Sequence, residues 1–256
     1  MALFTDGPIS SAKDLHEYEA SVLTDANAEG IDVVAKVALA QQDLANELIL
    51  FLLRRASLRD YQPDVRRSRG LADVVVTDAL RQWHIHKTLA MVYRDAYNNQ
   101  LNDRYQGKWN EYEELAKGSS RTYFQLGVGV VADPIPRATT PELTSVPGNS
   151  AGATFYVVAT WVNSTGQEGA PSAYAQLSTL AGEVLAVVLT GIPPQNAVGW
   201  NAYVGASPSA VTRQNDNPMG IGTSWIMSGG LISGASLTMG QKPAWFIVDH
   251  RVIERG

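Results

Sequence analysis

Charge falls abruptly partway along the chain, and this step constrains the fold more than any other feature. Residues 1–148 carry 36 Lys, Arg, Asp and Glu side chains, about 24% of that segment, whereas residues 149–256 carry 9, about 8%. A single uniform fold would not divide its charges in this way, and 256 residues are enough for two ordinary domains. We therefore expect two domains of different construction.

Apolar residues of the first part recur at helical spacing, and Pro63 is the only proline between residues 10 and 127. The spacing predicts four helices, over about residues 10–30, 32–53, 73–100 and 102–123. Ser10 or Ser11 is expected to cap the first helix, with Asp14 in its first turn, where the helix dipole favours an anion. The short link at residues 98–100 predicts that the last two helices are antiparallel neighbours.

The second predicted helix ends in a run that is apolar on every side. A helix end without a polar face must be covered on several sides, either by its own domain or by a neighbouring subunit. We therefore assign a candidate inter-subunit surface to its apolar side chains: Leu48, Ile49, Phe51, Leu52 and Leu53.

Six arginines follow within residues 54–69, against the two acids Asp60 and Asp64. They form a candidate basic segment that faces DNA or a partner: Arg54, Arg55, Arg59, Arg66, Arg67 and Arg69. The segment is compatible with a solvated loop whose charges pair locally, and equally with a surface that meets an acidic partner or DNA phosphates. Its one aromatic residue, Tyr61, is not the repeated interleaving of aromatic and basic residues that stacks on bases, so sequence-specific recognition is not expected.

From residue 128 onward the sequence pattern changes from helical to extended. Prolines in residues 128–150 predict an extended linker between the helical domain, residues 1–127, and a second domain. The pattern of residues 151–243 predicts an antiparallel β-sandwich of immunoglobulin or fibronectin type III style, with strands near 154–162, 172–177, 183–189, 199–204 and 223–226. Phe155, Val157, Ala159 and Trp161 should share one face. Residues 244–256 are expected to form a C-terminal tail. The sequence pattern of residues 244–253 predicts one more strand within it.

Residue types that carry chemistry are few. The chain has no cysteine, which excludes disulfides and thiolate metal sites. His84 and His86 stand two apart, a spacing at which one helix cannot chelate a metal. No secretory leader is expected after Met1, and the longest apolar run, residues 48–53, is far shorter than the roughly 20 residues of a membrane span. We expect no enzyme, no cofactor, no metal site and no membrane partner.

Several segments nevertheless resemble a known family. Residues 80–96 (LRQWHIHKTLAMVYRDA), Asn102 to Tyr105 and the Trp109-x-x-Tyr112 pattern are similar to helical head–tail connector proteins of tailed phages and prophages. Residues 155–162 (FYVVATWV), the turn Gly166-x-x-Gly169-x-Pro171-Ser172 and residues 199–205 (GWNAYVG) resemble the fibronectin-like modules of phage virion proteins. Together these segments span about residues 10–136 and 152–240.

The resemblance implies a structural role and no catalysis. Such connectors form a ring, usually of twelve subunits, in the neck of the virion after assembly in the host cytoplasm. The ring lies between the portal protein and the tail-completion proteins (a stopper or a tail protein) and helps to form the DNA channel. The resemblance also implies that the basic segment touches genomic DNA without sequence preference, and that the apolar end of the second predicted helix lies between subunits.

Two other classes of function stay open at this point. If Trp161, Trp200 and Trp225 were platforms on which sugar rings stack, the sandwich would belong to a virion decoration or tail protein that binds host surface glycans. A metal-dependent hydrolase would need the histidines to hold a metal.

Overall fold

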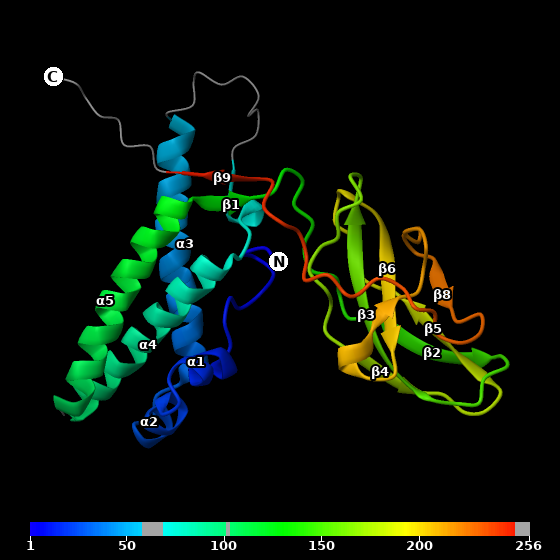
Figure 1. The fold of residues 1–256 in the computed structure, drawn as a ribbon, viewed down its shortest axis with the longest axis horizontal. Helices are drawn as coiled ribbons and strands as arrows, with labels where there is room; N and C mark the ends of the chain where they lie inside the picture. Colours follow the sequence, from blue (N-terminus) through cyan, green and yellow to red (C-terminus); the bar gives the residue numbers. More distant parts are fainter. Residues whose placement is uncertain (58–68, 101–102, 249–256) are drawn as a thin grey trace. The chain divides into compact units, whose positions relative to one another are not determined.

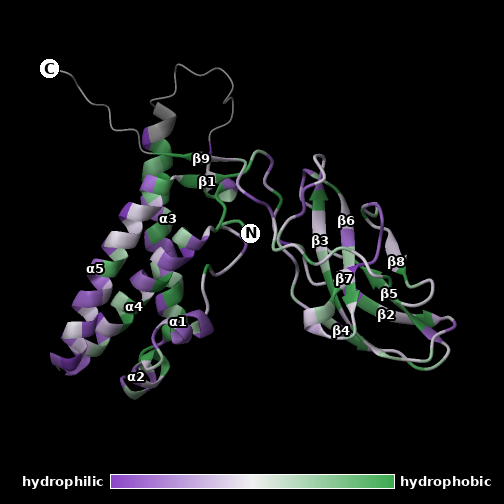
Figure 2. Ribbon diagram, in the orientation of Figure 1, coloured by the Kyte–Doolittle hydropathy of each residue, from purple (hydrophilic) through white to green (hydrophobic). Residues whose placement is uncertain are grey.

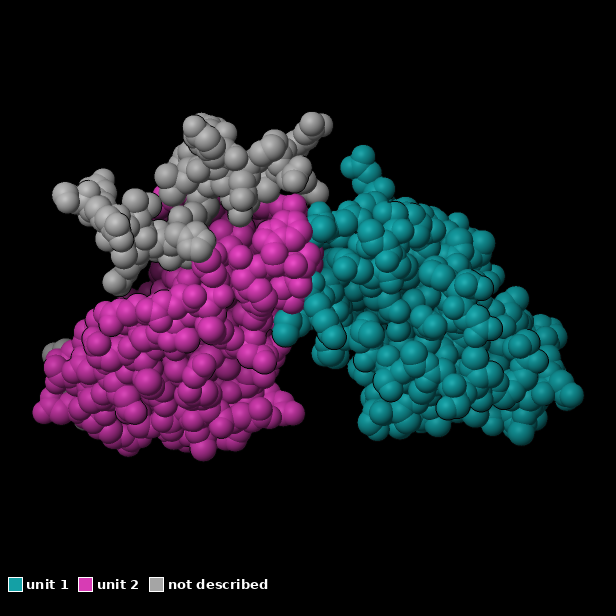
Figure 3. Space-filling view, turned by 45° about the horizontal axis from the view of Figure 1, so that its top comes forward, with its two compact units in different colours: residues 1–6, 132–242 teal, residues 7–131, 243–256 magenta. Residues whose placement is uncertain are grey.

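A computed structural model describes residues 1–57, 69–100 and 103–248, without the side chains of residues 55–57. A helical region is followed by antiparallel sheets (Figure 1). The chain divides into two compact units, coloured separately in Figure 3. The helical unit comprises residues 7–131 and 243–256, and the sheet unit comprises residues 1–6 and 132–242. The sheet unit is therefore inserted into the helical unit rather than appended to it.

The helical unit contains the described α-helices, one 3₁₀ helix and one two-stranded sheet. Its elements are α1 (Ala12–Tyr18), α2 (Val22–Ala28), α3 (Val33–Ser57), the 3₁₀ helix η1 (Leu71–Asp73), α4 (Asp78–Gln100), α5 (Asp103–Leu126), β1 (Val128–Val130) and β9 (Trp245–Ile247). Ser11 caps α1 as expected: the Asp14 N–H donates to its hydroxyl at 3.3 Å, and the Ser11 N–H donates to the Asp14 carboxylate at 2.6 Å.

The prediction of one helix over residues 10–30 was wrong, because the chain breaks between α1 and α2. Glu19 leaves the helical conformation, and its carboxylate accepts hydrogen bonds from the Ser21 hydroxyl at 2.9 Å and the Tyr112 hydroxyl at 2.9 Å. Lys108 lies 3.0 Å from the same carboxylate. Burial opposes ionisation of Glu19, but these partners outweigh it and lower its pKa to about 2.

The third predicted helix begins five residues later than expected. Val74, Val75 and Val76 are β-branched and extended, and the Val75 N–H donates to the Gly129 carbonyl at 2.9 Å. Thr77 then accepts the Leu80 N–H at 3.3 Å, and α4 starts at Asp78. At the other boundaries α3 and α5 run three to four residues beyond the predicted ends, to Ser57 and Leu126.

Aromatic pairs confirm that α4 and α5 are antiparallel neighbours. As residue numbers rise along α4, those of the partners fall along α5: Trp83 with Tyr123 at 5.7 Å, Tyr93 with Tyr112 at 5.7 Å and Tyr97 with Trp109 at 5.8 Å between ring centroids. Most of these rings lie in the core, and Trp83, Tyr93 and Tyr123 are fully buried. Such contacts add about 0.5–1.5 kcal/mol per pair beyond their area.

β1 and β9 close the helical unit on either side of the insertion. They pair antiparallel, with Val128 opposite Ile247 and Val130 opposite Trp245. Gly127 joins α5 to β1 at φ +97, and a Cβ there would lie 2.8 Å from Val248 Cγ1. Only glycine meets both demands, because other residues disfavour this φ and would clash.

The sheet unit contains a three-stranded and a four-stranded antiparallel sheet, ordered β2-β5-β8 and β4-β3-β6-β7. Its elements are β2 (Glu142–Pro147), β3 (Thr154–Asn163), β4 (Ala175–Ser178), β5 (Glu183–Val188), β6 (Ala197–Gly205), the 3₁₀ helix η2 (Pro208–Ala210), β7 (Thr212–Arg213) and β8 (Ser224–Ile226). One apolar core includes residues of both sheets. Phe155, Val157, Ala159 and Trp161 all belong to it, which confirms their predicted common face.

The expected boundaries differ from these units in three places. Residues 128–150 are not a linker throughout, because β1 belongs to the helical unit and β2 pairs with β5 in the sheet unit. The predicted domain 1–127 loses residues 1–6 to the sheet unit. The predicted strand 244–253 is strand at Trp245–Ile247, and its part beyond residue 248 lies outside the described residues.

The insertion predicts that the helical unit folds without the sheet unit. The Ala244 N–H donates to the Val130 carbonyl at 2.8 Å, so the chain ends left by removing residues 132–242 are adjacent. A chain that starts at Gly7 and joins Val131 to Pro243 through an Asn-Gly turn should keep its helices and unfold cooperatively. Circular dichroism during urea denaturation measures both properties. Loss of helix signal or a gradual transition would contradict the prediction.

His84 predicts a specific pH dependence of stability. Its ring is fully buried between the Ser10 hydroxyl, 2.8 Å from Nδ1, and the Val37 carbonyl, 3.0 Å from Nε2, and burial lowers its pKa from 6.5 to about 4. Since the folded pKa is depressed, the contribution to stability is present above pH 6.5 and is lost as pH falls through about 4.

Between pH 7 and pH 4, the wild-type free energy of unfolding should therefore fall by roughly 3 kcal/mol more than that of His84→Gln. Urea denaturation across this range measures the difference. Glu19 does not contribute to this difference, because its titration is common to both chains. Parallel pH profiles for the two proteins would refute this role of His84.

Candidate subunit interface on the helical unit

Helix α3 carries apolar side chains on two opposite faces. One face is buried at three- and four-residue steps: Val37, Ala40, Leu44, Leu48 and Leu52. The other face is exposed and carries Leu39, Ile49, Leu50 and Leu53. Leu50 stands two residues from both Leu48 and Leu52, which places it about 160° from each around the axis. In Figure 2 the C-terminal half of α3 is accordingly mostly hydrophobic.

The predicted inter-subunit surface is divided between these faces. Leu48 is 0% and Leu52 is 6% exposed, so their own unit covers them, and assigning them to a subunit contact was wrong. Ile49 and Leu53 remain exposed, Leu53 at 59%. We call the exposed set Leu39, Ile49, Leu50 and Leu53 the outer face of α3. Helical geometry explains the division, because a helix in contact with one layer of its own domain leaves the opposite side uncovered.

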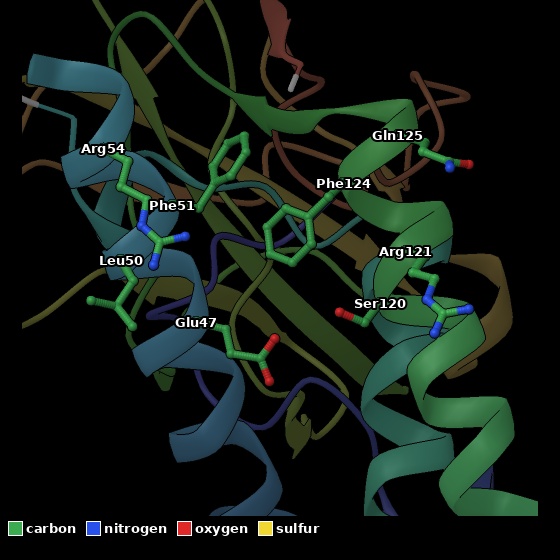
Figure 4. Close-up of a pocket in the computed structure, with 8 residues that line it drawn as sticks. All are labelled: Glu47, Leu50, Phe51, Arg54, Ser120, Arg121, Phe124 and Gln125. Atoms are coloured by element: carbon green, nitrogen blue, oxygen red, sulfur yellow. The ribbon is translucent and has the colours of Figure 1, made fainter. Parts of the chain in front are cut away.

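A groove of about 560 Å³ lies beside this outer face, between α3 and the last turns of α5 (Figure 4). It is lined by Glu47, Leu50, Phe51, Arg54, Ser120, Arg121, Phe124 and Gln125. Phe51 and Phe124 form its apolar wall, with ring centroids 4.9 Å apart. Phe124 in turn lies 5.5 Å from the buried ring of Trp83, so this wall is continuous with the core.

Charges of both signs surround the apolar wall. Arg54 comes from α3 and Arg121 from α5, while Glu47 and Ser120 reach toward each other across the groove (Figure 4). Partial burial raises the pKa of Glu47, with Asp43 adding to this effect and Lys87 opposing it. The arrangement suits a ligand that offers an apolar centre with charged neighbours, which is the composition of a peptide segment.

The sequence pattern alone did not reveal the α5 side of this groove. Ser120, Arg121, Phe124 and Gln125 lie near or beyond the predicted end of the fourth helix at residue 123. A usable signal was present in Gly127, since glycine commonly follows the last helical residue, and placing the helix end there would have made Phe124 a helical residue three positions after Arg121.

The predicted basic segment is only partly described. Arg54 is exposed and lines the groove. Arg59, Arg66 and Arg67 lie outside the described residues, as does the side chain of Arg55. A common surface for the five arginines from Arg54 to Arg67 therefore stays a prediction.

Arg69 does not face a partner, which corrects its assignment to that segment. Its side chain is 12% exposed and lies over the Trp245 ring, 4.7 Å from the centroid. Its Nη1 donates to the Val131 carbonyl at 3.0 Å and lies 3.5 Å from Asp73 Oδ1. Asp73 also accepts the Gly70 N–H at 2.8 Å. Arg69 therefore ties η1 and β1 to β9.

Other candidate residues serve packing. His86 is buried, and its Nδ1 lies 2.7 Å from the Ser119 hydroxyl. Within the described ranges no group of three or more His, Asp or Glu side chains gathers closely enough to hold a metal. In the sheet unit, Glu168 accepts hydrogen bonds from Thr160, Asn201 and Tyr203, all between 2.7 and 2.8 Å.

No helix in the described part of the chain has the length and apolar character needed to cross a membrane.

Two substitutions on α3 should separate its faces. Leu48→Ala opens a cavity in the core and should lower the free energy of unfolding by about 2–5 kcal/mol. Leu50→Ala removes a side chain that is 54% exposed and should change it by less than about 0.5 kcal/mol in dilute, monomeric protein. Urea denaturation of both variants tests this difference. Equal losses would mean that the two residues are equally covered.

Comparison with known proteins adds no family to this geometry. No protein-family model, no curated protein and no solved structure matches the chain. The resemblance to head–tail connectors therefore stays a prediction, and any assignment of function rests on the residues themselves.

Proposed function

We propose that this protein is a structural virion component, a head–tail adaptor whose helical unit assembles into a ring in the neck of a tailed phage. One observation carries the proposal: α3 is apolar on the side opposite its own core. Single exposed leucines are ordinary, but four large apolar side chains on one helical face form a surface that needs a partner.

A ring supplies such a partner without any second protein. Subunits of a ring meet head to tail, so a surface on one subunit packs against a different surface on the next. The outer face of α3 and the α3–α5 groove share Leu50, but their other residues differ, so they offer two adjoining surfaces for such contacts. The number of subunits, twelve, comes from the resemblance alone, as do the portal protein above the ring and the tail-completion, stopper or tail protein below it.

The helices are proposed to be the antiparallel bundle of such connectors, and the sheet unit an immunoglobulin- or fibronectin-type sandwich. Its four-stranded sheet, β4-β3-β6-β7, follows the C′-C-F-G order of that fold, and the β2-β5 pair follows B-E. Trp161 supports this interpretation, because a buried tryptophan on strand C is typical of the fold. The described part departs from the pattern in β8, which occupies the position of strand D although it follows β7 along the chain.

A role in the DNA channel would use two arginines of the described helices. Arg54 and Arg121 provide positive charge beside the groove. DNA contact through these side chains would be non-specific, since guanidinium groups bind phosphates of any sequence. The remaining arginines of the candidate segment that would strengthen this role lie outside the described residues or, in the case of Arg69, are held inside the unit.

The geometry does not favour the two competing functions. Trp161 and Trp200 are 2% and 0% exposed, so two of the three proposed glycan platforms cannot stack on a sugar. Trp225 is partly buried and packs against the core of the sheet unit. His84 and His86 each bond to groups of the helical core, which supports a packing role over a hydrolytic one. We therefore propose a non-enzymatic protein.

Charge placed on the outer face of α3 should abolish the ring. In the proposal, Leu50→Glu with Leu53→Glu leaves a monomer whose thermal unfolding is unchanged, because both side chains are more than half exposed. Sedimentation velocity of concentrated protein and electron microscopy measure assembly. The matched control is Leu180→Glu with Ile192→Glu, exposed positions of the sheet unit, which should still assemble.

Two outcomes would reject the proposal. Wild-type protein that stays monomeric at high concentration, with no ring in micrographs of the particle, would remove the need for a partner surface. Rings formed equally by the Leu50→Glu, Leu53→Glu variant would place the contact elsewhere.

A further inference from the structure

We propose that the outer face of α3 packs antiparallel against α5 of a second copy of this chain. In this contact Leu50 lies against Leu115 of the second copy. Leu39 lies against Leu126 of the same copy. The inference rests on the proposed ring and names the surface that receives α3. The α3–α5 groove is not that surface, because it shares Leu50 with the outer face, and one side chain cannot belong to both halves of a head-to-tail contact.

α5 carries an exposed stripe without charged side chains. Leu115 is 39% and Leu126 is 60% exposed, and their separation of eleven residues places them within about 20° of each other around the axis. Gly118 and Thr122 lie between them at three- and four-residue steps and are exposed as well. We call Leu115, Gly118, Thr122 and Leu126 the α5 stripe.

The α5 stripe faces away from the α3 helix of its own subunit. Phe124, which lines the α3–α5 groove, stands nine residues after Leu115 and is therefore half a turn around the helix from it. Tyr123 is buried, and its ring packs on Trp83 of α4, about 80° from Leu115 around the axis. The groove and the core thus take two sides of α5 and leave the stripe available to another molecule.

Gly118 is an independent sign of a close neighbour. Glycine inside a helix is destabilising relative to alanine, so it needs a reason. A Cβ on Gly118 would meet no atom within 4 Å, and its own subunit therefore gives no steric reason for glycine. The distance between two packed helices depends on the side chains at their contact, and a missing side chain lets a second helix approach closely.

The two surfaces match in spacing and size. On α3, Leu39 and Leu50 stand eleven residues apart, about 16 Å along the axis. The two leucines of the α5 stripe have the same separation. Between the leucines of α3 the same face carries the exposed Asn46, which would lie over the small residues at the middle of the stripe. Leucines therefore meet at both ends, and an uncharged polar side chain meets small ones between them.

Charge favours the antiparallel direction. When Leu50 lies against Leu115, an antiparallel pair places Arg54 beside Glu111, because each stands four residues from its leucine. Both side chains are exposed and opposite in sign. Opposite charges beside a helix contact set the orientation of the partner. A parallel pair with Leu50 against Leu126 would place Arg54 beyond the end of α5, where no helical acid faces it.

Cysteine pairs test both the contact and its direction, because the chain has no cysteine of its own. Full-length chains with one substitution each are mixed two at a time and treated with oxidised glutathione at a concentration at which the wild type assembles. The predicted pairs are Leu50→Cys with Leu115→Cys, and Leu39→Cys with Leu126→Cys. The swapped pairs, Leu39→Cys with Leu115→Cys and Leu50→Cys with Leu126→Cys, use the same four variants and are the matched controls. One chain of each mixture carries a tag, so that a non-reducing gel separates mixed dimers from dimers of one variant.

We expect at least fivefold more mixed dimer from the predicted pairs than from the swapped pairs. A disulfide needs Cβ atoms about 4 Å apart, whereas the swapped positions would lie about 16 Å apart. Equal yields, or a higher yield from the swapped pairs, would overturn the contact while the ring itself stands. Wild-type protein that does not assemble would overturn the ring and this contact together, so the two failures are distinguishable.

A second variant tests the contact without cysteines. Gly118→Leu should leave the thermal unfolding of dilute monomer unchanged or raise its midpoint, because the site has room and leucine favours helix. It should nevertheless raise the concentration needed for assembly at least tenfold in sedimentation velocity, because the added side chain blocks the approach of α3. Asn110→Leu, at an exposed α5 position about 140° from Leu115, is the matched control and should assemble as the wild type does. Assembly of Gly118→Leu at the control concentration would overturn the proposal.

Discussion

The pairing of β1 with β9 is the interaction on which the rest of the architecture depends. β1 carries the chain out of the helical unit and β9 carries it back, so their three residue pairs fix both ends of the insertion. Short two-stranded ribbons are marginal in water. This one is supported by Val75 on its other edge and by the Arg69 side chain, which bonds to Val131 and covers the Trp245 ring. An arginine suits this position because its planar group both stacks and donates hydrogen bonds.

The sequence predicted the kinds of element well where local signals were strong. The Ser11 cap, the antiparallel pair α4 and α5, and the inward face of β3 follow from a capping serine, a short link between two helices and strand alternation. It failed where distant partners decide. The break at Glu19 depends on Tyr112 and Lys108 from α5, and the late start of α4 depends on the pairing of Val75 with Gly129. Contacts between residues so far apart in the sequence have no local signature.

The candidate interface shows the same limit. A run of apolar residues on a helix indicates that every side of the run must be buried against other residues. The run alone does not say which side is buried by the helix's own domain. Leu48 and Leu52 turned inward and Leu50 and Leu53 outward because α3 meets its own core along one stripe only. The groove required α5 as well, and the predicted end of that helix lay three residues too early although Gly127 marked the true end.

The insertion also sets an order for folding during synthesis. β1 has left the ribosome long before β9 is made, since about 115 residues separate them. At roughly 5–20 residues per second, β1 waits about 6–23 s for its partner. The intervening sheet unit is complete within that interval apart from its last residues, so the helices acquire their closing strand only after the inserted unit has emerged. The nascent helical unit therefore passes through a stage in which the Val128–Val130 edge is open, and a slow codon or a chaperone acting between residues 131 and 243 would prolong it.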